Sequence, residues 1–138
     1  VTLIITPYTT PLPLFSPPLI HADLALTPHQ QQQIRIQLAA VLECVVSQQL
    51  IRKEHGGRVA ALEVLFANNA IRNLIRDGKT FQIPSVMQTS RRAGMKLGMQ
   101  TMDDALCELF MSGQISQDAA ITYAQDPVAM NRKVNFEI

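Results

Sequence analysis

The first helical pattern in this chain begins where Thr27 precedes Pro28. A Thr at the N-cap with Pro at the first helical position is typical of a helix start. Apolar residues then recur every three or four positions, which predicts a helix from about Pro28 into the low 40s. Its apolar positions are Ile34, Leu38, Val41, Leu42 and Val45.

Beyond Val45 the pattern changes to that of strands. Apolar and β-branched residues dominate Val45–Ile51, and a second apolar run occupies Val59–Phe66. Gly56 and Gly57 stand between the two runs, and glycine accepts the positive φ angles of tight turns. Two strand-like runs around a Gly-Gly turn predict a β-hairpin.

The remainder of the chain has the pattern of short helices separated by capping residues. We expect one helix to begin at Asn68 or Asn69 and to end at Gly78. The next should begin at Thr101, with Asp104 three residues further on, and end at Gly113. A third should begin at Ser116 and the last at Asp126-Pro127. Within 101–112 the apolar residues repeat at the spacing of a core-facing stripe. We therefore expect a mostly helical C-terminal part.

The first 20 residues carry no charge but contain five prolines. Prolines at this density oppose a membrane-spanning helix, and no basic segment precedes them as it does in a signal peptide. We expect residues 1–27 to form a Pro-rich extended arm or edge strand, with no transmembrane segment.

The composition is that of one folded domain. The chain has 138 residues, of which 47% are apolar, and its net charge is +1. Residues 58–96 carry seven basic and two acidic side chains, whereas residues 97–138 carry two basic and six acidic ones. These segments pair within the chain, pair between neighbouring subunits, or form two separately solvated surfaces; charge alone leaves these alternatives open.

A search for chemistry gives no catalytic, cofactor-binding or metal-binding residue. Cys44 and Cys107 lack a CxxC spacing, which predicts free, buried, reduced thiols, and the three histidines have no metal-ligand spacing. Gly78-Lys79-Thr80 resembles the end of a phosphate-binding loop. The position five before Gly78 is Asn73, not Gly, and the approach is helical, so a helix end is the better interpretation.

The segment Ala70–Lys79 (AIRNLIRDGK) predicts an amphipathic helix with its apolar residues on one arc. Arg72 and Arg76 are four residues apart, so they project side by side and together suit a carboxylate or phosphate. The alternative is that both arginines belong to an ordinary solvated face.

AIRNLIRDGK closely resembles the AIRNLIRE-type signature of the twitching-motility, or pilus retraction, ATPases of the type II/IV secretion ATPase superfamily. Residues 29–130 resemble this family, and the matching segments follow one another in the family's order. Gln30–Leu42 resembles a helix that leads out of the ATPase core, and Val45–Leu50 and Gly57–Leu65 resemble the two strands that follow it. Gln82–Thr89 and Gly98–Asp103 resemble the family's C-terminal end. Residues 1–27 do not match well, and Asp77 stands where the family usually has Glu.

The resemblance implies an α/β fold: the trailing part of a RecA-like P-loop ATPase domain, at 28–67, followed by a mostly helical C-terminal subdomain at 68–138. The family's phosphate loop and catalytic Glu are absent from this sequence. ATP and Mg²⁺ are therefore implied for a full-length parent, with no cofactor in this chain, which is predicted to be inactive alone.

The function implied is that of a hexameric motor that powers type IV pilus retraction and twitching motility. The implied location is cytoplasmic, peripheral to the bacterial inner membrane at the pilus base, with the ring neighbours and the inner-membrane platform proteins as partners and no nucleic acid. The resemblance gives the signature a coupling role, and its residues are Ala70, Ile71, Arg72, Asn73, Leu74, Ile75, Arg76, Asp77, Gly78 and Lys79.

A second hypothesis is a freestanding small binding module that docks an acidic protein or nucleic acid through the basic middle. It depends on the charge excess of residues 58–96, which include the pair Arg91-Arg92. No aromatic residues are interleaved there to stack on bases.

Overall fold

The computed structural model describes residues 3–7, 27–92 and 98–136. A long antiparallel hairpin, on which the helices pack, consists of β2 (Cys44–Arg52) and β3 (Arg58–Phe66). The register runs from Cys44 opposite Phe66 to Arg52 opposite Arg58. The hairpin predicted from the two apolar runs and the Gly-Gly turn is thus confirmed.

A third strand, β1 (Leu3–Pro7), pairs in parallel with β2, so that the sheet order is β1-β2-β3. Its place at the sheet edge agrees with the expected edge strand, and an edge is where a strand tolerates proline. The rest of the expected Pro-rich arm, residues 8–26, lies outside the described residues.

Helix α2 (Pro28–Val41) begins as predicted. The Thr27 hydroxyl accepts the Gln30 N–H, and the Gln30 side chain accepts the Thr27 N–H, which completes a capping box. Of the apolar positions that predicted this helix, Leu38 is partly buried and Leu42 and Val45 are buried, whereas Ile34 and Val41 remain 42% and 59% exposed. The described neighbours cover one narrow face of α2.

Helix α3 (Asn69–Arg76) follows β3 and is capped by Asn68, as predicted. A 3₁₀ turn, η1 (Thr80–Gln82), leads into α4 (Ile83–Arg92), which the sequence pattern did not predict as a separate helix. Three more helices complete the fold: α5 (Met102–Met111), α6 (Gln117–Tyr123) and α7 (Pro127–Phe136). Their starts at Thr101, Ser116 and Asp126 are confirmed by side-chain caps.

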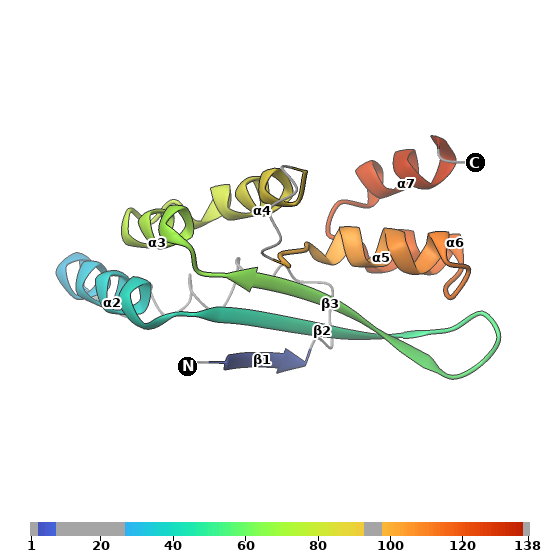
Figure 1. Ribbon diagram of the computed structural model, residues 1–138, viewed down its shortest axis with the longest axis horizontal. Helices are drawn as coiled ribbons and strands as arrows, with labels where there is room; N and C mark the ends of the chain where they lie inside the picture. Colours follow the sequence, from blue (N-terminus) through green and yellow to red (C-terminus); the bar gives the residue numbers. More distant parts are fainter. Residues whose placement is uncertain (1–2, 8–26, 93–97, 137–138) are drawn as a thin grey trace.

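The helices gather over the hairpin in two groups (Figure 1). Helices α2, α3 and α4 lie near the open end of the hairpin, whereas α5, α6 and α7 lie toward its turn. Each group has its own apolar cluster, and the two clusters share no residue. The first includes Leu65, Ile71 and Ile75; the second includes Ile51 and Leu106.

Two glycines end helices by the same motif. The Gly78 and Lys79 N–H groups donate to the Ile75 and Leu74 carbonyls, and Gly113 and Gln114 do the same at the end of α5. Gly78 has a φ of 70° and Gly113 a φ of 68°, which disfavour any residue with a Cβ. A Cβ on Gly78 would meet Arg35 Nη1 at 3.0 Å, whereas one on Gly113 would meet nothing within 4 Å.

Gly78→Ala and Gly113→Ala therefore form a matched pair. Each should lower the free energy of unfolding by about 1 kcal/mol through backbone strain. Gly78→Ala should cost at least as much as Gly113→Ala, because the Arg35 guanidinium must also move. Urea denaturation followed by circular dichroism measures both values, and a neutral effect of either substitution would contradict the motif.

Candidate functional site

The signature helix α3 is anchored through its inner face. Ile71 and Ile75 are buried, at 0% and 2% exposure, and Leu74 packs partly buried against the same cluster. At the helix start the Ile71 N–H donates to Asn68 Oδ1 at 3.0 Å. The predicted amphipathic pattern is confirmed, and its buried half fixes α3 against the sheet and α2.

Arg72 points from α3 to the C-terminal end of α2. Its Nη1 donates to the carbonyls of Ala39 at 2.6 Å and Ala40 at 3.1 Å, and its Nη2 forms an ion pair with Glu43 at 3.0 Å. Helix α2 has no basic residue in its own last turn. Arg72 therefore supplies the positive charge that the negative end of the helix dipole favours.

Helix α2 makes the reciprocal contact at the end of α3. Gln32 Nε2 donates to the Arg76 carbonyl at 3.3 Å, and the Arg35 guanidinium lies over Gly78. Each helix thus has its C-terminal end held by a side chain of the other. The two helices are locked in an antiparallel register that a slide along either axis would break.

The predicted arginine pair does not act as one anion clamp in this structure. The Arg72 side chain is only 21% exposed and is engaged with α2, whereas Arg76 is exposed and Nη1 donates to Asn73 Oδ1 at 3.1 Å. Lys79 and Asp77 form an exposed pair at 3.5 Å. The outward face of the signature, defined by Asn73, Arg76, Asp77 and Lys79, is the part available to a partner.

Gly78-Lys79-Thr80 is a helix end. The first two amides donate to the Ile75 and Leu74 carbonyls, and Thr80 begins η1. A phosphate cradle needs such amides to point at the ligand. This geometry agrees with the interpretation drawn from the spacing.

Other candidate chemistry is sparse in the described residues. Cys44 and Cys107 are free, as predicted, but half-buried instead of buried, and burial raises the pKa of the Cys44 thiol. No group of three or more His, Cys, Asp or Glu side chains among residues 3–7, 27–92 and 98–136 is placed to hold a metal ion. Within the same ranges, no helix is long and apolar enough to cross a bilayer.

The sequence analysis missed one buried carboxyl group. Glu63 is 3% exposed, on the helix-facing side of β3 between Ala61 and Leu65. Gln125 Nε2 donates to Glu63 Oε2 at 3.0 Å. Strand alternation places Glu63 on the face of Val59, Ala61 and Leu65, but the opposite face is equally apolar in sequence, so alternation alone does not indicate which face is buried.

The amino-acid sequence of this chain is similar to proteins of type IV pilus retraction and twitching motility. The chain is 44% identical over 103 residues to the twitching motility protein of Neisseria gonorrhoeae, covering 74% of this chain and 26% of that protein. It is also 44% identical over 98 residues to the type IV pilus retraction ATPase PilT of Pseudomonas aeruginosa, covering 71% of this chain and 27% of that one. The chain thus spans about a quarter of the length of these curated relatives.

The fold of the chain is similar to that of a solved pilus retraction motor, in agreement with the sequence similarity. The crystal structure of the pilus retraction motor PilT with bound ADP matches with a TM-score of 0.68 and 37% identity, over 83% of this chain and 30% of that chain. The chain therefore matches the C-terminal part of a PilT-like ATPase, within the type II/IV secretion ATPase superfamily. The α/β fold predicted from the resemblance is confirmed.

The N-terminal segment has a second similarity that the sequence analysis did not find. Residues 1–38 match the family described as stationary phase-inducible protein CsiE, C-terminal domain. Because the PilT match covers 83% of the chain, the two matches must overlap within residues 1–38. Residues 1–27, which the sequence analysis left unmatched, thus have a relative of their own.

The distinct roles of the two arginines lead to a prediction. Arg72→Ala should lower the free energy of unfolding by about 1–3 kcal/mol, because it leaves two helix-end carbonyls and Glu43 without their donor. Arg76→Ala, the matched control, should change it by no more than about 0.5 kcal/mol. Chemical denaturation of the purified chain measures both, and equal effects would contradict the role assigned to Arg72.

Proposed function

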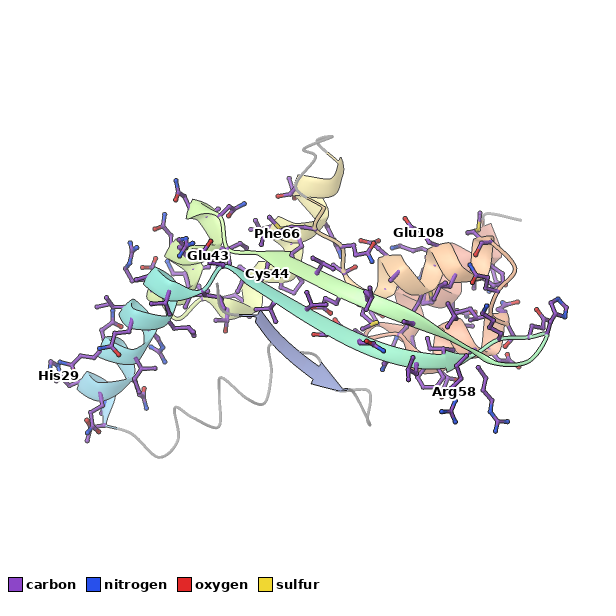
Figure 2. The ribbon with its side chains drawn as sticks, turned by 60° about the horizontal axis from the view of Figure 1, so that its bottom comes forward. His29, Glu43, Cys44, Arg58, Phe66 and Glu108 are labelled. Atoms are coloured by element: carbon purple, nitrogen blue, oxygen red, sulfur yellow. The ribbon has the colours of Figure 1, made fainter. Side chains whose placement is uncertain are left out.

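We propose that this chain is the C-terminal portion of a hexameric motor ATPase that powers type IV pilus retraction and twitching motility. The observation that carries the proposal is the joint match to PilT in sequence, at 44% identity, and in structure, at a TM-score of 0.68. The basic-module hypothesis is not favoured. Arg58 lies near the hairpin turn and Glu43, the partner of Arg72, near the open end (Figure 2), so the basic middle is not one surface.

The proposed work of the signature is coupling. The buried face of α3 and the Arg72 contacts fix α3 to α2, so that the two helices move together. The outward face of Asn73, Arg76, Asp77 and Lys79 moves with them and is exposed to a neighbour. A rigid helix pair with a polar outer face suits the transmission of domain movement to a neighbouring subunit or to the pilus platform.

The nucleotide belongs to other parts of such a motor in this proposal. PilT binds ADP in its crystal structure. The phosphate loop and catalytic Glu of the family are missing from this sequence, so ATP and Mg²⁺ would be held by a parent's preceding residues. The proposed setting is the cytoplasmic face of the bacterial inner membrane at the pilus base, with ring neighbours and platform proteins as partners.

A hybrid motor tests the coupling role. The matching C-terminal part of Pseudomonas aeruginosa PilT is replaced by residues 28–138 of this chain, and retraction is followed by twitching and ATP turnover by phosphate release. The double substitution Asn73→Ala and Arg76→Ala should abolish twitching while most of the ATPase rate remains, because it removes two side chains of the outward face and leaves the buried face of α3 unchanged.

The control is Arg132→Ala, which removes an exposed arginine of α7 and should leave both activities unchanged. If the unsubstituted hybrid does not retract pili, the two alanines are placed in the AIRNLIR-type segment of PilT itself. An equal loss of twitching and ATP turnover would refute a coupling role.

The isolated 138-residue chain should show no ATP turnover above a buffer blank, with or without Mg²⁺. Lys79→Ala provides the matched variant, because it removes the lysine of the Gly-Lys-Thr tripeptide. Turnover by the wild-type chain that disappears in Lys79→Ala would show that the tripeptide binds phosphate after all.

A further inference from the structure

The helix-facing side of the hairpin is apolar at both ends and polar in the middle. Val45 and Leu65 belong to the first apolar cluster, and Ile51 and Ala61 to the second. Between them lie three buried polar side chains, which we call the polar seam: Ser47, Gln49 and Glu63, at 0%, 5% and 3% exposure. The two helix groups are therefore packed on separate apolar areas of one hairpin.

Glu63 joins the polar seam to the second helix group. It accepts hydrogen bonds from the Met102 N–H, at the first residue of α5, and from Gln125 Nε2, in the connection between α6 and α7. Its strand partner is Ser47. The Ser47 hydroxyl, which can donate or accept, and Gln49 Oε1, which can only accept, are buried without a hydrogen-bond partner in the part of the chain that the structure describes.

The charged groups near Glu63 are mostly acidic. Asp103 raises the pKa of Glu63 and accepts the Gln125 N–H at 2.7 Å and the Asp126 N–H at 3.1 Å. Asp104, one residue further along α5, forms an ion pair with Lys133 of α7 at 3.5 Å. The strands contribute only the neutral Ser47 and Gln49 to this neighbourhood. The start of α5 and the α6–α7 connection are thus tied together beside Glu63.

We propose that α5, α6 and α7 form a unit that docks on the hairpin through Glu63, and that the charge on Glu63 sets how firmly this unit is docked. A neutral Glu63 carries an O–H that suits Gln49 Oε1, the buried acceptor of the polar seam, whereas a charged Glu63 adds a buried anion beside Asp103. This proposal concerns the chain itself and does not depend on a role in pilus retraction.

The direction of the pH effect follows from the environment of Glu63. Burial is the main reason why the pKa of Glu63 is raised from 4.5 to about 7; the hydrogen bonds from Gln125 and Met102 lower it, and Asp103 raises it further. A carboxyl whose pKa is higher in the docked state favours docking when it is protonated. Docking should be firmest below about pH 4.5 and should weaken as the pH rises through about 7.

Amide hydrogen exchange of the 138-residue chain tests the proposal, with rates corrected for the intrinsic pH dependence of exchange. Between about pH 5.5 and pH 8, protection in peptides from α5, α6 and α7 should fall roughly tenfold or more. Protection in peptides from α3 and β2 should change much less. An equal change in both groups of peptides, or no change in either, would overturn the proposal.

Glu63→Gln supplies the second arm, because it keeps the shape and an acceptor oxygen but removes the charge. It should abolish the selective pH dependence of α5–α7, while Glu54→Gln, a control at the exposed hairpin end, should retain it. A pH dependence that persists in Glu63→Gln would exclude Glu63 as its source. If Glu63→Gln does not fold, the wild-type comparison alone still decides between the outcomes.

Discussion

The position of the signature helix depends on one arginine that reaches across to another helix. The last turn of α2 contains no basic residue. Arg72 of α3 supplies the positive charge there, because it donates to the carbonyls of Ala39 and Ala40 and pairs with Glu43. A charged donor shared by two carbonyls and a carboxylate fixes both direction and register, which apolar packing alone does not. Because Ile71 and Ile75 bury the adjacent face, α3 has neither freedom to rotate nor freedom to slide. The polar residues on its outer side are therefore presented in a fixed orientation.

The hairpin has a different mechanical character. It is the one element that both helix groups share, and its helix-facing side carries two apolar areas separated by Ser47, Gln49 and Glu63. Polar groups buried in this way contribute less to cohesion than apolar ones and cost free energy when their bonding is incomplete. Helices α2 and α3 are cross-linked by reciprocal helix-end contacts. The α5–α7 region meets the hairpin through the second apolar cluster, through the paired backbone bonds of Gln100 and Val64, and through Glu63 with its two donors.

The sequence predicted those features that are decided within a few residues. The caps at Thr27, Asn68, Thr101 and Ser116, the hairpin and the glycine stop at Gly78 were all found, because each depends on local backbone geometry. Features that depend on distant partners were missed. Arg72 was paired with Arg76 as an anion-binding pair or assigned to a solvated face, because its acceptors lie some thirty residues earlier in the chain. Ile34 fits the helical spacing yet remains exposed, because periodicity reports an apolar face and not whether a neighbour covers it. The burial of Glu63 was missed because both faces of its strand are apolar in sequence, and only the helices packed on one face decide which side is covered.

Segments similar to CsiE and to PilT contact each other within the fold of this chain. Residues 1–38 match the CsiE C-terminal domain family, and they include both β1 and most of α2. Within that range Gln32 donates to the Arg76 carbonyl and Arg35 covers Gly78, so two of the contacts that hold the PilT-like signature come from residues that the CsiE family also matches. In the same way β1 completes the sheet by pairing with β2. A segment that was merely appended would make neither kind of contact. The described residues of the CsiE-like range, 3–7 and 27–38, are therefore a structural part of this fold through β1 and α2.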